Sequence, residues 1–225
     1  MKGLFRAAMA LGAAVLAMGQ APAPNWNTQF VETSGGHRVG NPAAKVKLTA
    51  FESYTCPHCA NFEREAEGAL RVVYIHSGNL SLEVRHIIRD PIDLTVAMLA
   101  NCGPKEKFFD NHRVFMLSQS TWLAGAVNPS QARLNRWTSG DPAARRRNIA
   151  QDLGLYAIME NRGYTQSEAN QCINDDAMAR KLATDSAANG ETYGVRGTPS
   201  FAINGTVLEN VHTWQSLSAK IDERL

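Results

Sequence analysis

The sequence of 225 residues lacks a long apolar run and has no large excess of charge of either sign. Its most apolar stretch, residues 7–18, is shorter than the about 20 residues that a membrane-spanning helix needs. Lysine and arginine number 23 and aspartate and glutamate 21, so no strong field draws the chain to nucleic acid or to a membrane surface. The one basic run, residues 145–147, contains no aromatic residue, which is typical of a solvated helix face. We therefore predict no nucleic-acid partner and no membrane insertion.

Cysteine is scarce, with four residues, and only one pair is separated by two intervening residues. A structural zinc site needs about four ligands, usually from two such pairs. The chain has no second pair, and most of its six histidines are scattered without ligand spacing. The sequence therefore predicts no metal site and no cofactor.

The first residues have the pattern of a secretory signal peptide. Lys2 and Arg6 precede the apolar stretch, and the small residues Ala17 and Gly19 lie where a signal peptidase cleaves. Removal of residues 1–19 takes away two positive charges and leaves 21 basic and 21 acidic residues. We predict that the mature chain is exported, soluble and formally neutral.

The most informative motif is Cys56-Pro57-His58-Cys59, which directly follows an apolar stretch at residues 46–51 and opens an amphipathic segment. The first turn of a helix leaves backbone N–H groups unpaired, and their partial positive charge favours a thiolate at Cys56. Pro57 suits the first helical position, and a protonated His58 would add a second positive neighbour. Since zinc ligands are missing, this pattern favours a redox-active dithiol.

The other two cysteines, Cys102 and Cys172, lie far apart in the sequence, each on a predicted helix. Cysteines of exported proteins are expected to pair, so we predict a structural disulfide between them. Closing so long a loop stabilises a fold by up to several kcal/mol. A pair of buried free thiols is the alternative that the spacing leaves open.

The pattern of apolar residues divides the mature chain into three parts. Residues 20–44 predict a loose segment with a short strand at 29–32. The rest of residues 20–90 predicts a β-α-β unit, with strands at 46–51 and about 80–84 on either side of the helix that the cysteine motif opens. Strand signals vanish over residues 91–189, where the composition predicts several short helices. Sheet character returns in residues 190–225, where an Asn-Gly turn predicts a hairpin before a final helix. The fold class is therefore α/β with an inserted all-helical subdomain.

Four features together resemble the DsbA-like thioredoxin-fold proteins: the motif at residues 56–59 after a buried strand, Phe62-Glu63 just beyond it, the helical insertion, and the Gly-Thr-Pro tripeptide at residues 197–199 before the hairpin. The resemblance covers nearly all of the mature chain. It implies a thioredoxin fold whose first part is residues 20–90 and whose second part is residues 190–225.

The resemblance also implies roles for individual residues. Cys56, Pro57, His58 and Cys59 would form the catalytic motif, with Cys56 as the reactive sulfur and Cys59 as its buried partner. Cys59 would close the disulfide and release mixed intermediates.

A second set of implied roles lies outside the motif. Pro199 would be cis beside Cys56, and the Thr198 backbone would bind a substrate strand. Glu63 would help to move protons to or from Cys59, although a solvated surface position is an equally good interpretation. Glu52, at the edge of a strand, is expected to be exposed.

The implied function is that of a periplasmic protein-disulfide oxidoreductase, a monomeric dithiol oxidase that donates its Cys56–Cys59 disulfide to reduced exported proteins. A DsbB-type, quinone-linked membrane protein would recharge it. Two alternatives stay open. One is a disulfide isomerase or reductase on the same fold, because Thr198 precedes the proline, although the 25 residues before Lys45 are too few for a dimerisation domain. The other is a periplasmic copper or zinc carrier that uses the thiols of the motif as ligands.

Overall fold

A computed structural model describes residues 24–225, so the predicted signal peptide lies outside the described residues. The strands are β1 (Phe30–Glu32), β2 (His37–Gly40), β3 (Val46–Glu52), β4 (Leu80–His86), β5 (Ser200–Ile203) and β6 (Thr206–Val207). The helices are α1 (Pro57–Ala69), α2 (Pro91–Ala100), α3 (Phe108–Leu117), α4 (Gln119–Leu123), α5 (Gln131–Thr138), α6 (Pro142–Asp152), α7 (Leu155–Asn161), α8 (Gln166–Asn174), α9 (Asp176–Tyr193) and α10 (Trp214–Asp222). A π-helical turn, Leu70–Ile75, extends α1.

The strands form a single mixed sheet in the order β1-β2-β4-β3-β5-β6. Strand β3 lies at its centre, parallel to β4 and antiparallel to β5. Helix α1 covers one face, where Phe62 packs against Phe201 of β5 with ring centroids 4.7 Å apart. Helix α9 covers the other face, where Tyr193 packs against Phe51 of β3 at 4.8 Å. With both faces covered, β3 is buried along nearly its whole length, as its run of apolar residues predicts.

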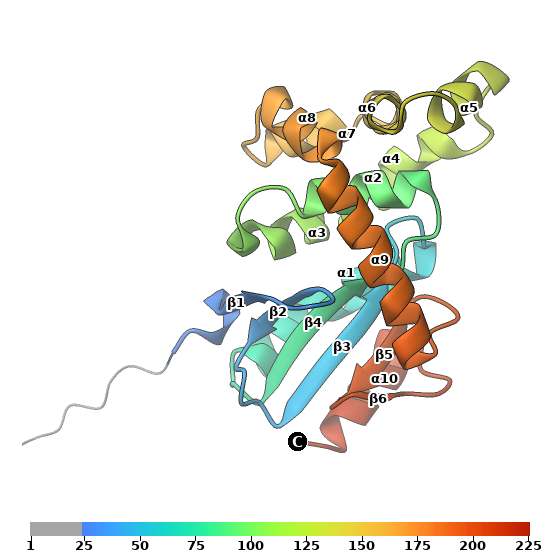
Figure 1. Ribbon diagram of the computed structural model, residues 1–225. Helices are drawn as coiled ribbons and strands as arrows, with labels where there is room; N and C mark the ends of the chain where they lie inside the picture. The colour runs from blue at the N-terminus through green and yellow to red at the C-terminus, as the bar shows by residue number, and fades with distance from the viewer. Residues whose placement is uncertain (1–23) are drawn as a thin grey trace, which may run out of the picture.

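The helical subdomain leaves the sheet after β4 and returns to it along α9. Figure 1 shows helices α2 to α8 stacked beyond the end of the sheet from which α1 starts, with α9 running from this stack down across the strands. A disulfide joins Cys102, just after α2, to Cys172 in α8, with the two Cα atoms 5.6 Å apart. The bridge therefore ties the first helix of the insertion to the helix that precedes α9.

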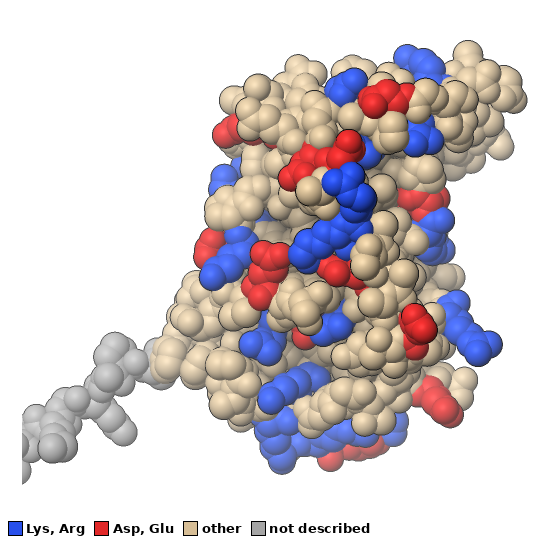
Figure 2. Space-filling view, in the orientation of Figure 1, with Lys and Arg blue, Asp and Glu red and all other residues tan. Residues whose placement is uncertain are grey.

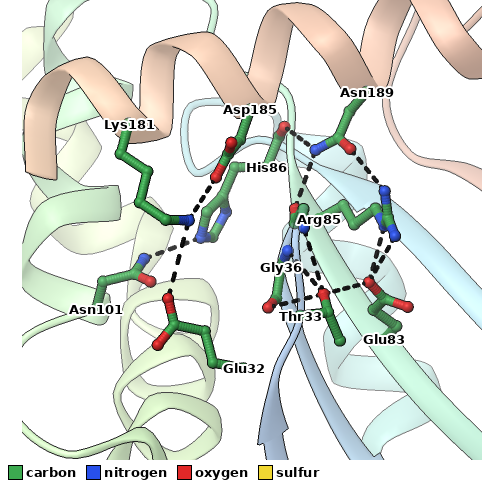
Figure 3. A network of polar contacts seen from close by, with 11 residues as sticks. Glu32, Thr33, Gly36, Glu83, Arg85, His86, Asn101, Lys181, Asp185 and Asn189 are labelled. Carbon is green, nitrogen blue, oxygen red and sulfur yellow. Dashed lines mark hydrogen bonds and ion pairs between the residues drawn. The ribbon is translucent and has the colours of Figure 1, made fainter.

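A polar network joins α9 to strand β4 and to the turn between β1 and β2 (Figure 3). Asn189 of α9 accepts a hydrogen bond from Arg85 of β4 at 2.9 Å and donates one to the backbone carbonyl of Gly35 at 3.1 Å. Arg85 also pairs with Glu83 at 2.8 Å, and Glu83 accepts a bond from the Thr33 hydroxyl at 2.6 Å. The network joins three segments that are distant in sequence, so it fixes the end of the helical subdomain on the sheet.

The surface carries charges of both signs. Figure 2 shows basic and acidic side chains interspersed over much of the face that it presents. Within residues 24–225, no helix has both the length and the apolar character that crossing a bilayer requires.

The predicted β-α-β unit and the final hairpin are present, while two elements differ from the sequence prediction. Strand β2 lies in a segment that we expected to be loose, and it pairs antiparallel with β4. Helix α9 is a single helix of 18 residues where several short helices were expected, and it runs past the predicted boundary at residue 189. Both elements depend on partners distant in the chain, which local composition does not reveal.

Candidate active site

The cysteine motif lies at the junction between strand β3 and helix α1. Cys56 is the residue that precedes the helix, with extended backbone angles, and Pro57 occupies the first helical turn, where its missing N–H costs no hydrogen bond. Both thiols are in the reduced, unbridged form. Cys56 is 3% exposed and Cys59 is fully buried, whereas His58 lies on the exposed side of the turn.

Hydrogen bonds stabilise the thiolate of Cys56. The pKa of Cys56 is lowered from 9.0 to about 5, first by the hydrogen bond from the Cys59 thiol and then by bonds from the Thr198 side chain and the backbone N–H groups of Cys59 and His58; burial opposes them. His58 thus contributes its backbone N–H to the anion. The start of the helix acts as the sequence predicts, since backbone N–H groups of its first turn donate to the sulfur.

Cys59 lies in the opposite environment. Its pKa is raised far above that of a free thiol, first by desolvation, then by its hydrogen bond to Cys56 and by the nearby charge of Glu52. A backbone hydrogen bond from Ser53 only partly offsets these effects. Near neutral pH the pair therefore consists of a thiolate at Cys56 and a thiol at Cys59.

The peptide bond between Thr198 and Pro199 is cis, and it faces Cys56. The Sγ atom of Cys56 lies 3.1 Å from the carbonyl oxygen of Thr198, a contact that a protonated thiol can make as a donor. The buried Thr198 hydroxyl has no other partner among the described residues, so it is free to donate to the thiolate. The loop is held from behind by hydrogen bonds of His212 to the Pro199 carbonyl at 2.8 Å and of the Ser200 hydroxyl to the backbone.

The loop between β3 and α1 is held by the helical subdomain. The carboxylate of Asp93 in α2 accepts hydrogen bonds from the Ser53 hydroxyl at 2.6 Å and from the backbone N–H of Tyr54 at 2.8 Å. The side-chain amide of Gln119 in α4 donates to the carbonyls of Tyr54 and Cys56 at 2.8 and 2.9 Å. The insertion therefore helps to position the backbone that carries the reactive sulfur.

Two carboxylates and a histidine lie buried beneath the motif. Glu52 at the end of β3, Glu63 of α1 and His112 of α3 place one ligand-type atom each within 4.8 Å of one another. His112 Nε2 lies 3.4 Å from Glu63 Oε1 and 4.0 Å from Glu52 Oε2, and its Nδ1 lies 2.9 Å from the Tyr54 hydroxyl. Burial first, and then the neighbouring charge of Glu63, raise the pKa of Glu52 well above its usual range.

The expectation that Glu52 is exposed is wrong, because its strand is the central one and the side chain is 0% exposed. Glu63 is also buried, so the solvated interpretation fails for it as well. Of the two carboxylates, Glu52 is the one whose charge acts on both active-site cysteines. His112 could not be predicted as part of the site, since nothing in its local spacing indicates that α3 packs against α1.

The comparisons with known proteins agree with this geometry. The thioredoxin family model matches residues 32–223, so the chain belongs to the thioredoxin family. A Rickettsia typhi protein named "Putative protein-disulfide oxidoreductase" is 28% identical over 188 residues, and a Rickettsia prowazekii protein with the same description is 27% identical. These matches take in 83% of this chain but only 61% and 60% of the relatives, so the chain spans about three fifths of their length.

Solved structures show the same fold. A structure from Novosphingobium aromaticivorans, described as a protein-disulfide isomerase, is 44% identical with a TM-score of 0.82, over 84% of this chain and 97% of that one. Wolbachia pipientis alpha-DsbA1 is 23% identical with a TM-score of 0.66, over 83% of this chain and 89% of that one. The expected α/β thioredoxin fold of the DsbA-like kind is therefore confirmed.

Proposed function

We propose that the protein is a dithiol oxidase that donates the Cys56–Cys59 disulfide to reduced exported proteins. The observation that carries the proposal is the asymmetry of the pair: the pKa of Cys56 is lowered to about 5 while the pKa of Cys59 is raised. A thiolate that the protein stabilises is a good leaving group, and it favours the reduced form of the enzyme. The oxidised form is then a strong donor of disulfides.

The exchange takes two steps. A substrate thiolate attacks Sγ of Cys56, which forms a mixed disulfide and breaks the Cys56–Cys59 bond; Cys59 leaves with the electron pair and takes up a proton. A second substrate thiolate then attacks the substrate sulfur of the mixed disulfide, and Cys56 leaves as its stabilised thiolate. The substrate has lost two electrons and the enzyme has gained them.

A buried sulfur needs a proton donor when it leaves as an anion. Glu52 is suited to that role, because its raised pKa allows it to hold a proton and its charge acts on Cys59. Glu63 lies on the same side of the sheet as Glu52, and its Oε1 atom is 3.4 Å from Nε2 of His112. Glu63 would pass protons between Glu52 and the surface. The proton relay that the sequence assigned to Glu63 alone is thus extended to a pair in which Glu52 stands next to Cys59.

The substrate would bind at the cis loop. The backbone of Thr198 lies beside the reactive sulfur, where an extended substrate segment can pair with it as an added strand. We place this chemistry in the periplasm, in a monomer that a DsbB-type membrane protein recharges with quinone as the final oxidant. These partners and this compartment follow from the likeness to DsbA-like proteins and from the signal-peptide pattern.

The equilibrium reduction potential of the Cys56–Cys59 pair against glutathione tests the direction of exchange. A Cys102→Ser/Cys172→Ser variant, measured beside the wild-type chain, removes any contribution from the second bridge. A potential well above that of the glutathione couple supports the oxidase. A potential close to that of thioredoxin would instead mean that the pair works as a reductant.

A disulfide isomerase is the second candidate, and one observation favours it. The structure that is 44% identical is described as a protein-disulfide isomerase. An isomerase must attack existing disulfides with its thiolate and leave again without net oxidation. Reactivation of a substrate protein with scrambled disulfides, by the reduced enzyme in the absence of any oxidant, would identify this activity, whereas an oxidase acts only on reduced substrate.

A further inference from the structure

The side chains of Glu52, Glu63 and His112, which we call the buried triad, bring two carboxylates and an imidazole together in the protein interior. The three residues are 0%, 5% and 2% exposed. No lysine or arginine of the described chain forms an ion pair with Glu52 or Glu63. Burying two carboxylates beside one imidazole is costly unless a proton or a cation offsets their charge.

Unpartnered atoms face the interior of the triad. Both carboxylate oxygens of Glu52 and the Nε2 atom of His112 are buried without a hydrogen-bond partner among the described residues. Buried polar atoms of folded proteins are nearly always paired, so three orphaned atoms in one cluster indicate that something binds between them. The atoms are an imidazole nitrogen and carboxylate oxygens, the donors that a transition-metal ion prefers.

The geometry suits an ion with short bonds. Tetrahedral zinc with bonds of about 2.0 Å places its ligand atoms about 3.3 Å apart. His112 Nε2 is 3.4 Å from Glu63 Oε1 and 4.0 Å from Glu52 Oε2, so small rotations of the carboxylates complete the three-ligand arrangement. Two carboxylates carry the charge that a divalent cation balances.

The imidazole of His112 is already oriented as a metal ligand. Its Nδ1 atom lies 2.9 Å from the hydroxyl of Tyr54, which is fully buried. A histidine that binds metal through Nε2 normally donates its other ring N–H to such a group, which fixes the tautomer. When Nδ1 donates its hydrogen to the Tyr54 hydroxyl, the Nε2 lone pair faces the carboxylates.

A small cavity beside the buried triad offers space for a water molecule and a path for an entering ion. It has a volume of about 30 Å³, and Glu63 and His112 form part of its wall. That volume holds about one water molecule, the usual fourth ligand of a three-residue zinc site. Glu67, Arg71 and Arg113 also line it, and their partly exposed side chains connect it to the surface. Glu67 pairs with both arginines, which reduces their repulsion of an entering cation.

We propose that the buried triad is a binding site for a divalent transition-metal ion, with Zn²⁺ as the cation that its ligands suit best. The ion is held by Glu52, Glu63 and Nε2 of His112, with water from the cavity completing the coordination. This site uses no cysteine, so it is separate from any metal binding by the Cys56 and Cys59 thiolates. A bound cation holds Glu52 as a carboxylate, and the ion and a proton compete for the same position.

Zinc titration of the fully oxidised protein tests the site, because both cysteine pairs are then closed and no thiolate is present. We expect one equivalent of Zn²⁺ per chain by isothermal titration, and a zinc-dependent rise in Tm. Glu52→Gln and Glu63→Gln keep the shape of each side chain and should weaken binding at least 10-fold. Glu65→Gln, an exposed carboxylate of α1 that does not line the cavity, and His76→Asn, on the surface, are the matched controls and should bind zinc like the wild-type chain.

Each result of the zinc titration either supports or overturns the proposed site. Stoichiometric binding that either triad variant weakens and both controls retain supports the site. Absence of stoichiometric binding to the oxidised chain, or binding that survives Glu52→Gln and Glu63→Gln, overturns it. If these variants fail to fold, anomalous scattering at the zinc edge from crystals of the oxidised wild-type protein decides the matter: an ion between the three side chains supports the proposal, and an ion elsewhere or none refutes it. None of these readouts depends on the direction of disulfide exchange.

Discussion

Cys56 and Cys59 lie in opposite surroundings, although the two cysteines share the first turn of one helix. Cys56 faces the donors of the helix start and the cis loop, and its pKa falls to about 5. Cys59 faces the buried Glu52, and its pKa rises. Position along the helix decides which environment a thiol meets.

The difference shows how a single fold makes one sulfur reactive and keeps its partner inert. The stabilisation of Cys56 comes from groups that are fixed by backbone geometry, namely N–H groups of the first turn and the loop at Thr198. The destabilisation of a Cys59 anion comes from burial and from a carboxylate at the end of the central strand. An exchange enzyme needs both, because the attacked sulfur must leave easily while the other must wait for a proton.

Replacing Cys56 or Cys59 by serine should have the largest effect, because each substitution removes one of the two sulfurs that are compared. Cys59→Ser should keep the reactive sulfur but be unable to expel a bound substrate through the internal disulfide, so mixed disulfides accumulate. Cys56→Ser should form no mixed disulfide, because the remaining sulfur is buried and protonated. Both variants should lose at least about 1000-fold in catalytic turnover, since no internal disulfide remains to be donated. The Cys56 thiolate of Cys59→Ser attacks a peptide that carries a disulfide and releases one of its sulfurs as a thiol, and non-reducing electrophoresis measures the mixed disulfide that remains.

The Cys102→Ser/Cys172→Ser variant is the control for that pair of substitutions. Its bridge lies in the helical subdomain, away from the motif, so turnover should persist. Equal trapping by Cys56→Ser and Cys59→Ser would contradict the assignment of a single attacked sulfur.

Removing the charge of Glu52 tests the environment of Cys59. Glu52→Gln keeps the size of the side chain but removes its ability to take the proton of Cys59, so closure of the disulfide at neutral pH should slow about 10-fold or more. Stopped-flow oxidation of the reduced enzyme by a small disulfide measures this rate. Glu67→Gln, a partly exposed carboxylate of the same helix, should react like the wild-type enzyme. A normal rate in Glu52→Gln would remove Glu52 from the proton path.

Elements of the fold can be predicted from the sequence where the pattern that specifies them lies in neighbouring residues. The apolar run of β3, the motif that starts α1, and the Asn-Gly turn between β5 and β6 each predict the element that the structure contains. The capping residues of several helices are likewise local. Together with Phe62-Glu63, the helical insertion and the Gly-Thr-Pro tripeptide at residues 197–199, these elements carry the resemblance to the DsbA-like thioredoxin-fold proteins.

The buried part of the site escaped prediction because contacts between distant elements create it. Glu52 looks like any carboxylate at the end of a strand until β4 and β5 enclose its strand and α1 covers it. His112 becomes its neighbour only when α3 packs on α1, and Tyr54 orients the ring from the active-site loop. Local periodicity carries no information about which helix of an insertion packs against the motif.

The pH dependence of the reduction potential sharpens the comparison between the two sulfurs. Below the Cys56 pKa of about 5, reduction takes up two protons with two electrons, and the potential falls by about 59 mV per pH unit. Above it only Cys59 is protonated, and the slope halves to about 30 mV per pH unit. The thiolate stabilises the reduced form fully above the ordinary thiol pKa of 9.0, and this stabilisation is lost as the pH falls through about 5.

Potentials measured from pH 4 to pH 9 against a glutathione buffer check the change of slope. A slope that stays near about 59 mV per unit up to pH 8 would mean that Cys56 titrates like an ordinary thiol. A second change of slope below pH 9 would mean that Cys59 titrates there too, and that the two environments are less different than the geometry indicates.

The smallest expected effect concerns His58, whose backbone N–H remains in every variant. His58→Ala removes only the exposed imidazole, which is not among the groups that lower the pKa of Cys56, so that pKa should rise by less than about 1 unit while the other donors continue to stabilise the thiolate. At pH 7 the thiolate fraction then stays above about 90%. Thiolate absorbance at 240 nm as a function of pH gives the pKa directly. A return to an ordinary thiol pKa would show that the imidazole, and not the helix start, holds the anion.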